Sequence, residues 1–569
     1  MNKERIGSAL QDATDTRDVV IGSGVLGSVG DILGRSFADR PAVVVADEHT
    51  WRAAGRQVQQ HLKAAGRTMP EPYLFPPNTF VYAEYANVEK LREALGGHDA
   101  IPVAVGSGSL NDLVKRAAHE LERPYMNVAT AASMDGYTAF GASIIRDGYK
   151  QTMTCPAPRA VVADLEVLAR APASMTASGY ADLLGKVTAG ADWLVADALG
   201  VEPIDPKIWS LVQGPLREAT GRPAELAAGD QQAMERLIEG LVMSGLAMQA
   251  HASSRPGSGS EHQFSHLWEM EGLGLDRQPP LSHGFKVGVG SIAVAALYER
   301  LLERDLGALD IEALRSAWPT PQAVEQAVRA AHTTPGLDEA AVKETLAKYI
   351  DADQLAQRLV RLRERWSALR RRLTEQLIPA ERLRAMLRAA GCPTGPAEIG
   401  LHRSAFQETY QRAQMIRRRY TVLDLATETG ILRECVDELF APAASGPRTP
   451  PREHRFETVP PTRPHWVDPT PPCEDRGLSG LARAPSRAPS TGPGSQNRRW
   501  STRNTGCRVS RTAAEVESTC TVSPSRRETP ASEYMWAASV AATGSIAGRG
   551  PRRPPPGRSV DARAGPRPR

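Results

Sequence analysis

Residues 101–118 read IPVAVGSGSLNDLVKRAA, an apolar run that passes through a glycine-containing turn into a helical pattern. The run at 101–105 has the length of a buried strand. The apolar residues after the turn recur at helical spacing, namely Leu110, Leu113, Val114, Ala117 and Ala118. A glycine turn at the start of a helix lets backbone N–H groups approach a phosphate, and the helix dipole favours the negative charge. Residues 106–109 are therefore either a pyrophosphate-binding turn or a tight loop without a ligand.

The same alternation of apolar runs and helical patterns extends over residues 1–165. DVVIGSG (18–24), PAVVVADE (41–48) and RPYMNVAT (123–130) are predicted strands, and residues 25–37 and 50–66 are predicted helices. Such alternation predicts a parallel sheet with helices on both faces. Ligands of these folds bind at the carboxyl ends of the strands.

From about residue 175 to 440 the pattern becomes almost wholly helical. The stretches at 359–377 and 405–420 are long amphipathic examples. The sequence thus predicts an α/β domain at 1–165 and an all-helical domain at 166–440, with a cleft between them as the expected place for a small-molecule site.

Composition bounds the class of protein. No apolar run reaches about 18 residues, and the N-terminus MNKERIGSALQDATDTRD lacks the apolar core of a signal peptide, so we expect a cytoplasmic protein without membrane insertion. The six cysteines are scattered without a CxxC pair, which favours isolated reduced thiols.

The last part of the chain, residues 441–569, differs sharply in composition. It holds 21 of the 44 prolines, and its 21 arginines against 10 acidic residues give it a charge of +11, which leaves −7 for residues 1–440. We predict a disordered tail. Binding to RNA or anionic membrane, or an out-of-frame extension without function, are the alternatives. The basic charge gives no reason to expect that the folded part binds nucleic acid.

Several blocks of the sequence, taken in order, resemble one enzyme family. GSGSLNDLVK (106–115) resembles the GGGxxxDxxK stretch of the iron-containing alcohol dehydrogenase and dehydroquinate synthase-like superfamily. Six further blocks resemble its sn-glycerol-1-phosphate dehydrogenase branch: VVADEHTWRAAG, ATAASMDGYTAFGASI, YADLLGKVTAGADW, SSRPGSGSEHQFSHLWEM, SHGFKVGVGS and RRRYTVLDLATETGIL. The resemblance runs from about residue 19 to 440. It implies a dinucleotide-binding α/β domain and a metal-binding helical domain.

The resemblance implies a metal held by Asp182, His262 and His283. One carboxylate and two imidazoles can hold a divalent cation, and this set suits Zn, Ni and Fe alike. Each residue alone has a structural alternative, such as a helix-terminal aspartate or a loop histidine. His266 lies one helical turn after His262 and is either a proton relay or a histidine that only supports the ligands.

The resemblance also implies NAD or NADP as the cofactor. Gly106, Ser107, Gly108 and Ser109 should face the pyrophosphate. Ser107 departs from the commoner glycine of the superfamily. The other predicted cofactor contacts are Asp112, Thr130, Ser133 and, at the adenine ribose, Asp47, whose carboxylate favours NAD over NADP.

For the substrate, Asp135 matches the family aspartate that contacts the substrate hydroxyls, and we expect it in the catalytic set; a simple turn residue before Gly136 is the alternative. Lys186 and Arg255 are candidate contacts of a substrate phosphate, with a solvated lysine as the alternative for Lys186. The serines around Arg255 extend this candidate phosphate cradle.

The resemblance implies the reversible reduction of dihydroxyacetone phosphate, a small phosphorylated triose, to sn-glycerol 1-phosphate. A glycerol or other polyol dehydrogenase, a dehydroquinate synthase-like lyase, and a non-enzymatic protein that binds through its tail are the alternatives. The family resemblance also leads us to expect a homo-oligomer.

Overall fold

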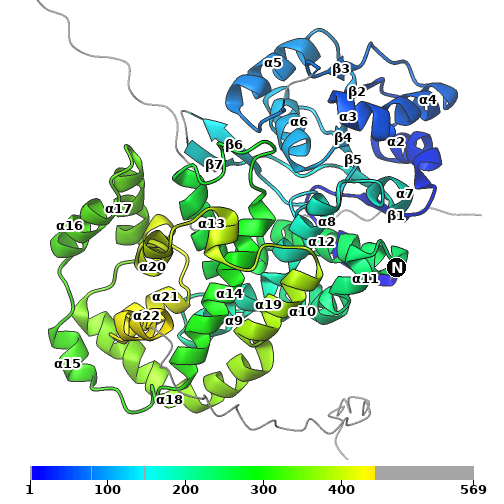
Figure 1. The fold of residues 1–569 in the computed structure, drawn as a ribbon. Coiled ribbons are helices and arrows are strands. Elements are labelled where there is room, and N and C mark those ends of the chain that lie inside the picture. The colour runs from blue at the N-terminus through cyan, green and yellow to red at the C-terminus, as the bar shows by residue number, and fades with distance from the viewer. Residues whose placement is uncertain (1–2, 78–79, 147–148, 442–569) are drawn as a thin grey trace, which may run out of the picture. The chain divides into compact units, whose positions relative to one another are not determined.

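The computed structural model describes residues 3–77, 80–146 and 149–441 (Figure 1). Apart from Ala441, the predicted disordered tail lies outside the described residues. No helix in the described ranges is long and apolar enough to cross a membrane.

A six-stranded parallel sheet forms the N-terminal part, as the sequence predicts (Figure 1). Its strand order is β1-β8-β5-β4-β2-β3. The strands are β1 (Asp18–Gly22), β8 (Ala160–Asp164), β5 (Met126–Ala129), β4 (Ile101–Gly106), β2 (Ala42–Ala46) and β3 (Tyr73–Leu74). Because all five pairings are parallel, the carboxyl ends of the strands share one edge of the sheet.

Two helices cover each face of this sheet. α2 (Val29–Phe37) and α4 (Arg56–Ala64) share a hydrophobic core with one face. α5 (Tyr85–Gly96) and α6 (Gly108–Glu120) share another core with the opposite face. The four inner strands, β8, β5, β4 and β2, are buried throughout, which explains their continuous apolar runs.

Short elements connect these strands. They are the 3-10 helix η1 (Val25–Ser28), α3 (Glu48–Thr50), the π-helix η2 (Trp51–Gly55), and an antiparallel hairpin of β6 (Ala142–Arg146) and β7 (Tyr149–Met153). The N-terminal α1 (Lys3–Asp12) packs on the helical part, where Ile6 and Ala9 are buried.

The rest of the described chain is helical. Its α-helices are α7 (Leu165–Leu168), α8 (Ala173–Leu184), α9 (Lys186–Ala198), α10 (Pro206–Thr220), α11 (Pro223–Ala227), α12 (Gln231–His251), α13 (Ser260–Met270), α14 (His283–Leu302), α15 (Ile311–Ser316), α16 (Pro321–Ala331), α17 (Leu337–Ala347), α18 (Ala352–Gln376), α19 (Ala380–Ala389), α20 (Arg403–Arg412), α21 (Val422–Glu428) and α22 (Leu432–Phe440). The 3-10 helices are η3 (Arg255–Gly257), η4 (Pro396–Ile399) and η5 (Ala413–Ile416). One hydrophobic core joins residues at the ends of β1, β5 and β8 to this helical part. The division into domains at residue 165 stays a prediction.

The helix predicted over 405–420 is wrong at its C-terminal end. α20 stops at Arg412, η5 follows, and Arg417 is extended with φ −147°. Other elements satisfy the backbone beyond this point: Gln263 donates to the Arg419 carbonyl at 3.1 Å, and Asp192 accepts from the Val422 N–H at 2.9 Å. Helical periodicity could not foresee these partners because they are distant in sequence.

Candidate metal and cofactor site

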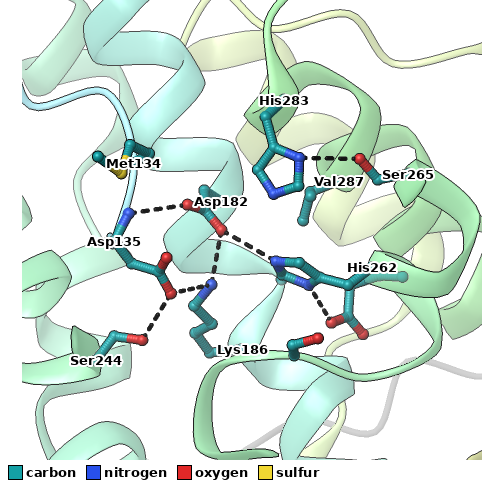
Figure 2. A network of polar contacts seen from close by, with 12 residues as sticks. Met134, Asp135, Asp182, Lys186, Ser244, His262, Ser265, His283 and Val287 are labelled. Atoms are coloured by element: carbon teal, nitrogen blue, oxygen red, sulfur yellow. Dashed lines mark hydrogen bonds and ion pairs between the residues drawn. The ribbon is translucent and has the colours of Figure 1, made fainter. Parts of the chain in front are cut away.

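Asp182 lies on α8 and is fully buried at the centre of a polar network (Figure 2). Its Oδ2 accepts a hydrogen bond from the backbone N–H of Asp135 at 3.0 Å. Its Oδ1 accepts one from Lys186 Nζ at 2.7 Å and lies 3.5 Å from His262 Nε2. The carboxylate is thus oriented by the loop after β5 and by the first residue of α9.

In each of the two predicted histidine ligands, one ring nitrogen contacts a glutamate carboxylate. His262 Nδ1 lies 2.7 Å from Glu261 Oε1, and His283 Nδ1 lies 2.9 Å from Glu269 Oε1. A hydrogen on each Nδ1 leaves Nε2 with its lone pair. Figure 2 shows the other ring nitrogen of His283 turned toward Asp182 and His262. Potential ligand atoms of Asp182, His262 and His283 all lie within 4.8 Å of one another.

Glu261 is itself held firmly. It is fully buried, and its Oε1 accepts from the Gly259 N–H at 2.6 Å while its Oε2 accepts from Thr188 Oγ1 at 2.8 Å. The sequence analysis missed both glutamates. The only available signal is that Glu261 is adjacent to His262 and that Glu269 follows His266 by three residues.

The charges around Asp182 act on its ionisation. Burial alone would raise the pKa of Asp182, but Lys186 and the histidines outweigh it, so the pKa lies well below its ordinary value. Burial and Lys186 act to lower the pKa of His262, but hydrogen bonding to Asp182 and Glu261 raises it overall. The cluster therefore presents an ionised carboxylate, as a cation site requires.

Asp182, His262 and His283, here called the trio, have the ligand types that a divalent cation requires. One carboxylate oxygen and two imidazole nitrogens converge, and each imidazole is fixed through its other nitrogen by a carboxylate, the arrangement that commonly orients histidine ligands. A second set of possible ligands, His266, Glu269 and His283, shares a histidine with the trio. Glu269 there is 3.5 Å from Lys286 Nζ, and Arg417 contacts His266, so nearby positive charge opposes a second cation.

Lys186 does not have the surroundings expected for a phosphate contact. Its side chain is completely buried, and Nζ lies 2.9 Å from Asp135 Oδ2 and 2.7 Å from Asp182 Oδ1. Burial lowers the pKa of Lys186, but the two carboxylates outweigh it and raise the pKa overall. Its charge is matched by these two anions, which argues against both the predicted phosphate contact and a solvated lysine.

Arg255 also differs from the prediction. Its side chain is fully buried, and it donates to the carbonyls of Tyr420 at 3.0 Å and Asp192 at 2.8 Å. The serines of the predicted cradle are engaged too, because Arg419 donates to Ser258 Oγ and Ser254 Oγ, each at 2.8 Å. The geometry corrects the prediction: this loop is a structural junction between α9 and the segment after η5.

His266 lies beside the trio. Its ring centroid is 5.9 Å from that of His262 and 5.7 Å from that of His283, so the predicted shared helical face is present. Arg417 lies 3.0 Å from its Nδ1 through a guanidinium nitrogen. Since arginine can only donate, the imidazole hydrogen lies on Nε2. Burial and Arg417 lower the pKa of His266 well below its ordinary value.

The glycine turn lies where the sequence places it, between β4 and α6. Ser107 is the N-cap of α6 and makes no side-chain capping bond, so the first N–H groups of a 13-residue helix have no side-chain cap. Residues 107–109 are partly exposed. A Cβ on Gly106 would lie 2.7 Å from Leu110, and one on Gly108 would lie 3.0 Å from Met134, so both positions need the close approach that glycine allows.

A second glycine turn follows β1, and the carboxylate of Asp164 already accepts hydrogen bonds from its backbone N–H groups. Asp164 accepts from the N–H groups of Gly24 at 3.2 Å, Leu26 at 3.0 Å and Glu166 at 3.0 Å. Of these two turns at the carboxyl edge of the sheet, the one after β4 is the better candidate for a pyrophosphate.

The remaining predicted cofactor residues make hydrogen bonds within the protein. Asp112 accepts from the Ser143 N–H at 3.0 Å, and Ser133 Oγ lies 3.2 Å from Tyr137 Oη. Thr130 donates its N–H to the Gly106 carbonyl at 3.1 Å, beside the turn. Asp47 accepts from Thr50 N–H at 2.8 Å as the N-cap of α3. Their contacts with a dinucleotide stay predictions.

Lys115 was not singled out from sequence. It is buried, and its Nζ donates to the carbonyls of Gly136 at 3.1 Å, Ala139 at 2.8 Å and Gly141 at 2.9 Å. It thereby fixes the loop after β5 onto α6, and the same loop carries Asp135.

Comparison with known proteins assigns the family. The profile of the family described as iron-containing alcohol dehydrogenase matches residues 20–172. Two enzymes named glycerol-1-phosphate dehydrogenase, with NAD(P)+ as cosubstrate, are each 31% identical to this chain. They come from Bacillus licheniformis, with 70% of this chain and 85% of the relative covered, and Geobacillus thermodenitrificans, with 68% and 86% covered. The chain belongs to the glycerol-1-phosphate dehydrogenase family.

Two further matches are more distant or cover less of the chain. The glycerol-1-phosphate dehydrogenase of Halalkalibacterium halodurans is 38% identical over 45% of this chain and 64% of its own length. A crystal structure of sulfoacetaldehyde reductase from Bifidobacterium kashiwanohense in complex with NAD+ matches with a TM-score of 0.46 and 14% identity, over 74% of this chain and 96% of that one. This glycerol-1-phosphate dehydrogenase family member is an NAD(P)-dependent oxidoreductase.

Substitution of Glu261, which contacts His262, tests the metal centre of this glycerol-1-phosphate dehydrogenase family member. Replacing Glu261 by glutamine removes the charge that supports the Nδ1 hydrogen but keeps a side chain of the same size. We expect the affinity for Zn²⁺ to fall by about 10- to 100-fold in a competitive chelator titration. Glu271→Gln is the control, because Glu271 pairs with Arg412 outside the site. Equal Zn²⁺ affinities for all three proteins would contradict the proposed role.

Proposed function

We propose that this protein reduces dihydroxyacetone phosphate to sn-glycerol 1-phosphate, reversibly, with NADH or NADPH as hydride donor. The observation that supports this most directly is the convergence of Asp182, His262 and His283 beside the loop after β5. That loop begins at the sheet edge where the glycine turn also lies, so residues that would hold the nicotinamide and residues that would hold the metal lie at the same edge. The two curated relatives with 85% and 86% coverage carry the corresponding name.

In this proposal Asp182, His262 and His283 hold the metal, which polarises the substrate carbonyl when bound. Lys186 balances the charges of Asp182 and Asp135 and keeps both carboxylates in place. Asp135 Oδ2 is occupied by Ser244 Oγ at 2.9 Å and by Lys186, whereas none of the described residues bonds to its Oδ1. We assign Oδ1 to a substrate hydroxyl.

His266 supports proton movement in this proposal as a neutral imidazole. Arg417 fixes the hydrogen on Nε2, so that nitrogen can donate to a water or to the substrate oxygen. The amides of residues 108–110 take the pyrophosphate, while Thr130 and Ser133 lie on the nicotinamide side and Asp47 on the ribose side.

One assay tests the proposal. Chelated full-length protein is supplied with Zn²⁺, Ni²⁺ or Fe²⁺ in turn, and NADH and NADPH oxidation is followed with dihydroxyacetone phosphate and with dihydroxyacetone. We expect turnover only after a metal is restored, with dihydroxyacetone phosphate as the preferred substrate by at least about 100-fold in kcat/KM, since a charged phosphate contact contributes a few kcal/mol. A preference for dihydroxyacetone would instead identify a polyol dehydrogenase. A lack of net NADH consumption with either substrate would contradict both dehydrogenase assignments.

A further inference from the structure

We infer that Asp192 is a positioning residue for the metal centre, an inference that rests on the metal site of the proposed function. Asp192 lies on α9 and is completely buried. Its Oδ2 accepts hydrogen bonds from the backbone N–H of Ser260 at 2.6 Å and from Ser260 Oγ at 2.7 Å. Ser260 is the first residue of α13, the helix that carries His262. Asp192 thus acts on a proposed ligand through the helix on which that ligand lies.

The contact with Ser260 caps α13 from another helix. The N-cap residue of α13 is Gly259, which has no side chain that could accept from the first N–H groups. The Asp192 carboxylate takes this role, and its negative charge also suits the positive end of the helix dipole. A Cβ on Gly259 would lie 2.5 Å from Asp192 Oδ2 and 2.7 Å from the Cα of Ala189, so the start of α13 packs directly against α9. The position of α13 along α9 is therefore fixed at this point.

The helix α9 also contacts two other parts of the proposed metal site. Lys186, its first residue, donates to Asp182 at 2.7 Å (Figure 2). Thr188 Oγ1 donates to Glu261 Oε2 at 2.8 Å, and Glu261 contacts His262 through its other oxygen. One helix thereby sets the carboxylate ligand and one imidazole ligand relative to each other.

Both oxygens of Asp192 act as acceptors. Oδ1 accepts from Tyr298 Oη at 2.6 Å and from the Val422 N–H at 2.9 Å, in addition to the two bonds that Ser260 donates to Oδ2. Burial and the charge of Glu261 raise the pKa of Asp192 to about 6, so the group is mostly ionised at neutral pH. A neutral amide has a single acceptor oxygen and cannot serve both sets of donors.

Asp192→Asn is the main test, because it keeps the size of the side chain but replaces one acceptor oxygen by an N–H donor. In the full-length protein we expect the Zn²⁺ affinity to fall by about 10-fold in a competitive chelator titration. The visible d–d absorption of the Co²⁺-loaded protein should also change, because His262 is less firmly placed. Asp197→Asn is the matched control, since Asp197 lies on the same helix but accepts from the Ile204 N–H at 3.1 Å, outside the site. It should keep the Zn²⁺ affinity and the Co²⁺ spectrum of the wild type.

Tyr298→Phe separates the anchoring of α13 from a general loss of stability. It removes one donor to Asp192 Oδ1 but leaves both bonds of Ser260, so the Zn²⁺ affinity should change much less than in Asp192→Asn. A lowered melting temperature of chelated Asp192→Asn, with the Zn²⁺ affinity and Co²⁺ spectrum of the wild type, would overturn the inference. If Asp192→Asn does not fold, Ser260→Ala takes its place. A weaker Zn²⁺ affinity of Ser260→Ala then supports the inference, and an unchanged affinity overturns it.

Failure of the proposed metal site would give a different result. A wild type that binds neither Zn²⁺ nor Co²⁺ would refute the site itself, and the inference about Asp192 with it. A wild type that binds both ions, together with an Asp192→Asn protein that binds them equally well, would refute only the role of Asp192.

Discussion

Replacement of His262 by alanine is expected to abolish metal binding and to lower kcat by at least about 1000-fold, whereas replacement of His266 by alanine should leave the metal in place. The difference follows from the geometry. His262 Nε2 lies 3.5 Å from Asp182 Oδ1 and its Nδ1 is anchored by Glu261, while His266 is bonded to Arg417. Loss of a metal that polarises a carbonyl costs several kcal/mol of transition-state stabilisation, hence the size of the effect.

Metal content per chain after dialysis against Zn²⁺ is the primary measurement for this pair, and the rate of NADH oxidation is the second. We expect about one Zn²⁺ per chain in the wild type and in His266→Ala, and almost none in His262→Ala, since a trio that loses one ligand no longer closes around the ion. Full metal content in His262→Ala would contradict the proposed ligand set. Loss of metal in His266→Ala would assign His266 to the ligands instead.

Gly284→Ala is expected to destabilise the protein by about 3–5 kcal/mol, which is at the upper end for a single substitution. A Cβ on Gly284 would lie 1.9 Å from the carbonyl oxygen of Ser178, a backbone atom of α8 that cannot move aside cheaply. This close approach of α14 to α8 also sets His283 beside Asp182. The substitution should therefore lower both the melting temperature and the Zn²⁺ affinity.

Gly7→Ala serves as its counterpart. Gly7 lies on the exposed side of α1, and a Cβ there would meet nothing within 4 Å. Because alanine favours helices over glycine by about 1 kcal/mol, this variant should be as stable as the wild type or slightly more stable. Thermal unfolding followed by circular dichroism separates the two substitutions. A Gly284→Ala protein that melts like the wild type would show that α8 and α14 can separate at little cost.

The sequence was informative about the fold wherever local pattern determines structure. The apolar run 101–105 and the glycines after it predicted β4, the turn and α6, because buried parallel strands and helix starts have local signatures. The end of the helix predicted over 405–420 was not predictable in this way. It ends early because distant side chains, including Gln263 and Asp192, satisfy the backbone after Ile416.

In the candidate site, too, some residues could be predicted from the sequence and others could not. Asp182, His262 and His283 were predicted by family resemblance, and the structure brings them together. Lys186 and Arg255 were selected for their charge and for their sequence positions near Asp182 and His262. Burial argues against that choice because neighbouring carboxylates and carbonyls already use their donors. Glu269 and Arg417 gain their significance from contacts with His283 and His266, and these partners are found only in three dimensions.

Asp135 has two separate roles, one for its backbone and one for its side chain. Its backbone N–H orients the Asp182 carboxylate, and any residue except proline supplies that group. Its side chain projects beside Lys186 and Ser244 and is assigned to the substrate. Substrate preference can therefore be redesigned at this position while the metal carboxylate keeps its backbone anchor, with one fewer negative charge beside Lys186 as the cost of most replacements.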